Sequence, residues 1–122
     1  MPMQLPAAEA AAVASGSALF RGLADPSRLA ILVELRKGER RVVDLAAMLG
    51  LAQATVSGHL ACLRDCGLVT WRPVGRQSYY RLAVTELEAL LRAAEQVLAR
   101  TGDAVVLCPN YGTAATAPPA GA

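Results

Sequence analysis

Residues 53–67 read QATVSGHLACLRDCG, and this stretch decides the interpretation of the whole chain. A helix advances about 100° per residue, so apolar residues three or four positions apart form one buried stripe. The residues with that spacing are Val56, Leu60 and Leu63. Small polar side chains occupy the first half, and two thiols, Cys62 and Cys66, occupy the second half. We therefore predict one helix with two chemically different ends.

A second, shorter helix is expected directly before it, from Arg41 to Leu49, with Gly50 as its C-cap. Its inward-facing residues are expected to be Val43, Leu45, Ala46 and Leu49. Two short helices joined by a glycine-containing turn, the second with polar residues near its start, indicate a helix-turn-helix. The polar side chains that lie largely off the buried stripe are Gln53, Thr55, Ser57 and His59. In such a motif these side chains reach DNA bases or phosphates.

The residues after Gly67 predict a β-hairpin, with strands at 68–71 and 78–82 and a turn at 72–77. Its turn residues Arg72, Arg76 and Gln77 are expected to contact DNA. Together these elements predict a mainly α fold with a small β-hairpin, a winged helix-turn-helix. Charge supports a polyanionic partner, because residues 40–81 carry six arginines against two aspartates, while residues 1–39 are balanced and 82–122 are acidic.

The flanking segments predict three more helices and two loose ends. A helix is expected over 7–23 and another from Pro26 to about Lys37, with Asp25 as N-cap and the apolar stripe Leu29, Leu32, Val33 and Leu35. A third is expected over 84–100, with the apolar stripe Leu87, Leu90, Leu91, Ala94, Val97 and Leu98. We expect one DNA-binding and dimerisation domain over 7–100, a flexible leader over 1–6, and a tail over 101–122 whose end is disordered.

The sequence lacks a long apolar run and a signal peptide, so a cytoplasmic protein without membrane association is expected. One histidine without a set of acidic partners or a glycine-rich phosphate loop argues against an enzyme. Cys62 and Cys66 are four residues apart, which places them on one helix face with Cβ atoms about 6 Å apart. Two such thiols suit one soft metal ion, although free cysteines are also common as small buried residues. From this pair alone the two readings are equally open.

Three segments resemble the ArsR/SmtB family of metal-responsive repressors: LADPSRLAILVEL (23–35), VVDLAAMLGLAQATVSGHLACLRDCGLV (42–69) and GRQSYYRL (75–82). The resemblance implies a homodimer that binds an imperfect inverted repeat in double-stranded operator DNA and releases it when metal binds. Some members carry a Cys-x-Cys pair where this chain has Arg41, Val42 and Val43, and others carry histidines on the last helix, where this chain has none.

The remaining pattern, CLRDC with one tail cysteine, resembles the cadmium- and lead-sensing members. It implies that Cys62, Cys66 and Cys108 bind Cd(II) or Pb(II) as the inducer, without an organic cofactor. In the resembled members the tail ligand comes from the other subunit, and the sequence leaves open which subunit donates Cys108. Three thiolates also suit arsenite or Hg(II), and a thiol redox switch involving Cys108 is a further alternative. His59 is an alternative fourth ligand, although DNA contact is the favoured reading for this residue.

Overall fold

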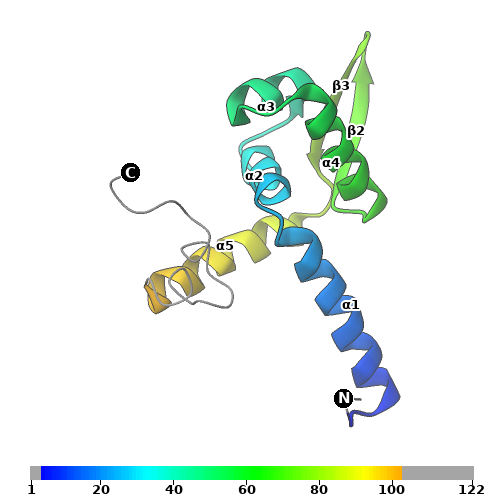
Figure 1. The fold of residues 1–122 in the computed structure, drawn as a ribbon, viewed down its shortest axis with the longest axis vertical. Coiled ribbons are helices and arrows are strands. Elements are labelled where there is room, and N and C mark those ends of the chain that lie inside the picture. Colours follow the sequence, from blue (N-terminus) through cyan, green and yellow to red (C-terminus); the bar gives the residue numbers. More distant parts are fainter. Residues whose placement is uncertain (1–3, 103–122) are drawn as a thin grey trace. The chain divides into compact units, whose positions relative to one another are not determined.

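The computed structural model describes residues 4–102, which form five helices and one three-stranded antiparallel sheet. The predicted leader at 1–6 lies partly outside this range, and the tail beyond Gly102, with Cys108, lies outside it entirely. The chain consists of two compact units, Met1–Thr85 and Glu86–Ala122. The first unit contains the winged helix-turn-helix (Figure 1).

Two helices open the first unit, α1 (Ala7–Leu23) and α2 (Pro26–Leu35). The predicted start of α2 is confirmed, since Asp25 is its N-cap and accepts a hydrogen bond from the backbone N–H of Arg28. The helix ends two residues before the expected Lys37. Its buried side chains are Ile31, Leu32 and Leu35, whereas Leu29 and Val33 are exposed. The predicted stripe was therefore wrong at two positions and omitted Ile31.

Arg40 and Arg41 form a short strand, β1 (Arg40–Arg41), where the sequence predicted the start of a helix. It pairs antiparallel with β3, so that Arg40 lies opposite Tyr80 and Arg41 opposite Tyr79. Two successive arginines carry no alternating pattern, which explains why the strand was missed. The following helix, α3 (Val42–Leu49), begins one residue later than expected and ends at Gly50 in the left-handed conformation.

Asp44 holds the start of α3 through a capping box with Arg41. Its Oδ2 accepts a hydrogen bond from the backbone N–H of Arg41 at 3.0 Å, and its Oδ1 accepts one from Nη2 at 2.8 Å. The hydrogen bonds from the Arg41 side chain and then from its backbone lower the pKa of Asp44 from 3.8 to about 2. The carboxylate is thus ionised throughout the physiological range, where it stabilises the first turn of the helix.

We expect Asp44→Ala to lower the melting temperature by about 5 °C at neutral pH, because it removes this cap. A carboxyl whose pKa is lower in the folded state stabilises the fold above its unfolded pKa and loses that effect as pH falls through the folded value. The difference between variant and wild type should therefore shrink as pH falls from 3.8 toward 2. Thermal unfolding followed by circular dichroism across this range measures it, and a difference independent of pH would contradict the assignment.

The helix-turn-helix consists of α3 and α4 (Gln53–Asp65), whose axes are bent by 115° at the three-residue connection. In α3, Leu45 and Ala46 are buried as predicted, Leu49 is partly buried, and Val43 is exposed, so the prediction for Val43 was wrong. Within the described part of the chain, no single helix is long and apolar enough to span a bilayer; only α3 and α4 taken together meet that criterion.

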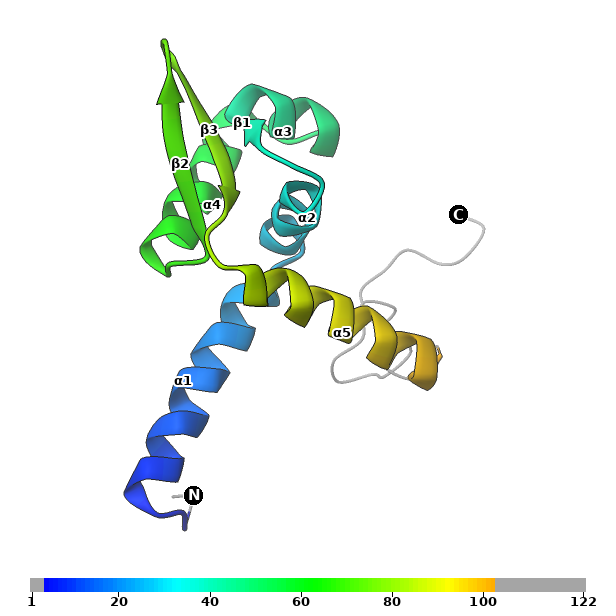
Figure 2. The same cartoon turned by 180° about the vertical axis from the view of Figure 1, so that it is seen from behind.

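The wing is the hairpin of β2 (Val69–Val74) and β3 (Gln77–Leu82), and the sheet has the order β1-β3-β2 (Figure 2). Its turn contains only Gly75 and Arg76, so the predicted turn at 72–77 was too long. Pro73 lies within β2 opposite Ser78. Proline is compatible with a strand there because β2 is an edge strand and needs no N–H on its open side.

The second unit contains all of α5 (Thr85–Thr101) except its first residue, and the helix is offset by one residue from the predicted one. Leu87 and Leu91 are buried, and Leu90 is partly buried. The other residues of the predicted stripe, Ala94, Val97 and Leu98, are exposed in the single chain. The last two turns of α5 therefore carry exposed apolar side chains.

Candidate DNA-reading helix and metal site

Packing fixes how α4 is turned about its axis. Val56, Leu60 and Leu63 are almost fully buried, as the sequence predicted. Gln53, Thr55 and Ser57 are exposed near the start of the helix. The structure thus gives these three side chains the solvent exposure that base or phosphate contact needs, although the contact itself remains a prediction.

His59 differs from these three side chains, because it is only 22% exposed. Its Nε2 lies 4.0 Å from Oδ2 of Asp25, at the start of α2. The sequence placed His59 with the DNA-contacting residues and gave no sign of this neighbour, which is 34 positions earlier. Burial therefore separates His59 from the other polar residues of α4.

At the tip of the wing, Arg76 and Gln77 are exposed beside Gly75, whose φ of 62° closes the tight turn. Arg72 lies within β2 instead, away from the turn where we had placed it. Its guanidinium forms a double hydrogen bond with Glu39, Nε to Oε2 at 2.8 Å and Nη2 to Oε1 at 3.0 Å. The group also lies 5.7 Å from the centroid of the Tyr79 ring. Arg72 is therefore already paired in the DNA-free chain.

The ion pair between Arg72 and Glu39 shifts the pKa of each group in the direction that favours its charged form. The side-chain hydrogen bond from Arg72 lowers the pKa of Glu39, and the same bond raises the pKa of Arg72. Both side chains are accessible to solvent, at 56% for Arg72 and 30% for Glu39. A DNA phosphate could therefore replace the carboxylate without burying a charge.

We expect Glu39→Gln to tighten DNA binding by roughly 3–10-fold at low salt, because it removes the carboxylate that competes for Arg72. The slope of log K against log salt concentration should also become steeper, by up to the amount that about one additional phosphate contact produces. Fluorescence anisotropy at several salt concentrations measures both quantities. Glu9→Gln, the same change at an exposed position in the first turn of α1, is the control. Equal behaviour of the two variants would show that Arg72 does not contact DNA.

The two thiols of α4 are free and exposed. Cys62 lies in the last turn of the helix, and Cys66 is its C-cap, with its N–H bonded to the carbonyl of Cys62 at 3.0 Å. This last turn keeps helical geometry, which places the thiols one turn apart on one side. Because both thiols are free and exposed, both sulfurs are accessible to a metal ion.

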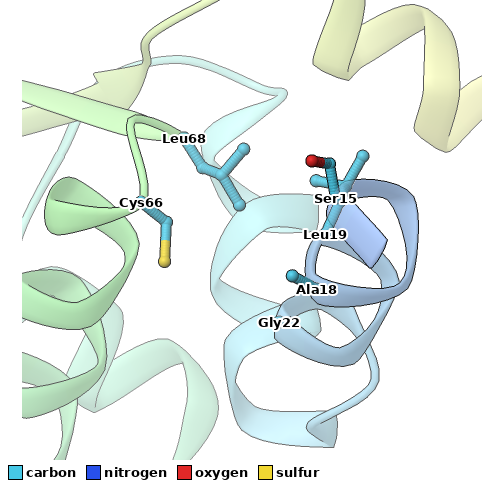
Figure 3. Close-up of a pocket in the computed structure, with 6 residues that line it drawn as sticks. All are labelled: Ser15, Ala18, Leu19, Gly22, Cys66 and Leu68. Carbon is cyan, nitrogen blue, oxygen red and sulfur yellow. The ribbon is translucent and has the colours of Figure 1, made fainter. Parts of the chain in front are cut away.

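A pocket of about 370 Å³ adjoins Cys66, lined by Ser15, Ala18, Leu19, Gly22, Cys66 and Leu68. Figure 3 shows the α1 residues on one side of it and Cys66 on the other. Among residues 4–102, no three His, Cys, Asp or Glu side chains come together as a metal site. The two thiols of α4 therefore supply at most part of a coordination sphere, and the predicted third ligand, Cys108, lies outside the described residues.

Comparison with known proteins gives the family. Residues 25–70 match the model described as bacterial regulatory protein, arsR family. The HTH-type transcriptional regulator CmtR of Mycobacterium tuberculosis is 49% identical over 80 residues, which are 66% of this chain and 68% of that protein. A probable mercury resistance operon repressor of Streptomyces lividans is 36% identical over 89 residues, 73% of this chain and 71% of that protein.

Two solved structures agree with the sequence relatives. The NMR structure of the cadmium metal-sensor CmtR from M. tuberculosis has a TM-score of 0.57 at 49% identity, covering 66% of this chain and 83% of that one. The homodimeric winged helix-turn-helix DNA-binding domain Mb0332 from Mycobacterium bovis has a TM-score of 0.67 at 34% identity, covering 84% and 94%. This chain belongs to the ArsR family of bacterial transcriptional regulators. Membership confirms the winged helix-turn-helix and the interpretation as a regulator instead of an enzyme.

Proposed function

We propose that the chain is a repressor that binds an imperfect inverted repeat in operator DNA as a homodimer and releases it when a soft metal binds. The observation that carries the proposal is the juxtaposition on α4 of exposed polar side chains with two exposed free thiols. Gln53, Thr55 and Ser57 would contact the major groove, and Arg76 and Gln77 of the wing the adjacent backbone.

Dimerisation is supported by apolar side chains that the single chain leaves uncovered. On α1, Phe20 is 58% and Val13 is 45% exposed, and on α5, Val97 and Leu98 are exposed. Large exposed apolar residues on two helices suit an interface between copies. The related Mb0332 domain is a homodimer, and a two-fold axis would match the two halves of an inverted repeat.

We assign the inducer site to Cys62, Cys66 and Cys108. Sulfur ligands select soft ions, so Cd(II) and Pb(II) fit this donor set, whereas Mg(II) and Ca(II) require oxygen ligands. The related CmtR of M. tuberculosis is a cadmium metal-sensor, which supports the same class of ion for this chain. Bound metal would neutralise thiolate charge and tie the end of α4 to the tail.

Release follows if the metal-bound arrangement of α4 fits the operator less well than the metal-free one. Because the proposed ligands and the reading residues share one helix, a constraint at its C-terminal end acts directly on the element that reads DNA. Coupling free energies between such sites are typically about 1–3 kcal/mol, or roughly 5–150-fold in affinity.

Titration of an operator duplex from the protein's own promoter, with and without Cd(II) or Pb(II), tests the proposal. We expect DNA affinity to fall at saturating metal, together with ultraviolet thiolate-to-metal charge-transfer absorption. Unchanged affinity would overturn it. Parallel titrations with Hg(II), arsenite and peroxide, with thiols counted after peroxide, distinguish the related inducers from a redox switch. Two thiols one helical turn apart have poor disulfide geometry, so a redox switch would require Cys108.

A further inference from the structure

His59 is partly buried in the first unit. It follows the buried Val56 by three positions and precedes the buried Leu63 by four, so its side chain flanks the packed stripe of α4. Its limited exposure of 22% and the 4.0 Å separation between Nε2 and Oδ2 of Asp25 agree with that placement. A residue that served DNA alone would resemble the exposed Ser57, two positions earlier on the outer surface.

In the contact between His59 and Asp25, the carboxylate of Asp25 is held in place by a hydrogen bond to the backbone. Its Oδ2 accepts the backbone N–H of Arg28 at 2.9 Å as the N-cap of α2. This hydrogen bond, followed by the charges of Arg28 and His59, lowers the pKa of Asp25. The carboxylate is therefore anionic at neutral pH, and the cap holds the oxygen that faces the imidazole.

The same turn of α2 also holds the end of α1. The side chain of Arg28 donates from Nε to the carbonyl of Gly22 at 2.8 Å and from Nη2 to that of Arg21 at 3.5 Å. These carbonyls belong to the last turn of α1, where the carbonyl of Arg21 also accepts the backbone N–H of Ala24 at 3.3 Å. One turn of α2 thus contacts the C-terminus of α1 through Arg28 and α4 through Asp25.

We propose that His59 is a positioning residue, which acts through Asp25 to hold α4 against the α1–α2 junction in the orientation that presents Gln53 to DNA. The inference rests on the proposed function, since it requires that α4 reads DNA. Cys62 and Cys66 lie one and two turns beyond His59 on the same side of the helix. A metal at the thiols would therefore act on the side of α4 that this contact holds.

A double-mutant cycle on operator affinity tests the inference, with His59→Ala, Asp25→Ser and the double variant. Serine remains a good N-cap, so Asp25→Ser removes the carboxylate while keeping the start of α2. We expect each single change to weaken operator binding by roughly fivefold and the double variant to be no weaker than either. The salt dependence should stay unchanged, because no phosphate contact is lost. Asp65→Ser, which removes the same charge from the end of α4, is the control.

Two further readouts separate positioning from folding. His59 is the single histidine of the chain, so its ring C–H resonances are identified without assignment. They should shift in Asp25→Ser and not in Asp65→Ser. His59→Gln, which keeps an N–H donor, should recover most of the affinity lost in His59→Ala when Asp25 is present and none of it in the Asp25→Ser background. The resonance readout applies even if His59→Ala fails to fold, because it compares only Asp25→Ser and Asp65→Ser with the wild type.

Additive losses in the cycle, or a salt slope reduced by about one phosphate contact in His59→Ala alone, would overturn the inference in favour of a direct DNA contact. His59 ring resonances that do not shift in Asp25→Ser would also overturn the inference. Failure of the proposed function gives a different result: the wild-type protein would then bind its own promoter no better than an unrelated duplex.

Discussion

Cys66→Ser should reduce the affinity for Cd(II) by on the order of 100-fold and abolish metal-induced release of the operator. Four protein ligands supply about 10–16 kcal/mol in thiolate-rich zinc sites, so one ligand accounts for a few kcal/mol. A serine hydroxyl is not ionised near neutral pH and is a poor ligand for soft ions. Since Cys66 is exposed and serine is nearly isosteric with it, the fold should be retained.

Metal titrations followed by charge-transfer absorption, and by operator binding in the same samples, measure this effect. Ala61→Ser, which adds a hydroxyl to the same helix without removing a thiol, is the control. Cys62→Ser and Cys108→Ser should behave like Cys66→Ser if all three residues are ligands. If Cys66→Ser released DNA at the same metal concentration as the wild type, the proposed metal site would be contradicted. If Cys108→Ser had no effect on metal binding or on release, the metal ligands would be limited to the two cysteines at the end of α4.

Leu32→Ala should cost about 2–5 kcal/mol of unfolding free energy, a large share of the roughly 5–15 kcal/mol of an ordinary domain. Leu32 is fully buried in α2, so its truncation leaves a cavity among the helices that support α4. Leu29→Ala, the same change three residues earlier in the same helix, should cost less than about 1 kcal/mol, because Leu29 is 37% exposed.

Urea unfolding at a fixed protein concentration measures both variants, since dimerisation makes apparent stability depend on concentration. The comparison isolates burial, because helix, residue type and substitution are the same. Similar losses for the two variants would mean that Leu29 is covered in the assembled protein, which the concentration dependence of Leu29→Ala would then reveal.

Leu29 and Leu32 also show why the buried face of α2 could not be predicted correctly from the sequence. From Leu29 to Leu35 almost every residue of α2 is apolar, so the periodicity defines no single inward face. In α4, by contrast, polar residues surround Val56, Leu60 and Leu63, and the buried stripe was predicted correctly. Periodicity therefore predicts orientation only for helices that have a polar side.

Local signals determined much of this protein from the sequence alone. The Asp25-Pro26 start of α2, the glycine after α3 and the position of α4 depend on interactions within a few residues, and all were predicted. The thiol pair was likewise predicted on one helix side, since its spacing is local. The family resemblance rested on the same segments, and the comparisons confirmed it.

Only the tertiary structure decided the contacts between residues far apart in sequence. Arg72 with Glu39, His59 with Asp25, and Arg40 opposite Tyr80 join positions more than 30 residues apart. Each needs two elements to pack before the partners meet, and neither partner carries a sequence signal for the other. For this reason the sequence placed Arg72 and His59 with the DNA-contacting residues but gave no sign that packing pairs the first with Glu39 and sets the second beside Asp25.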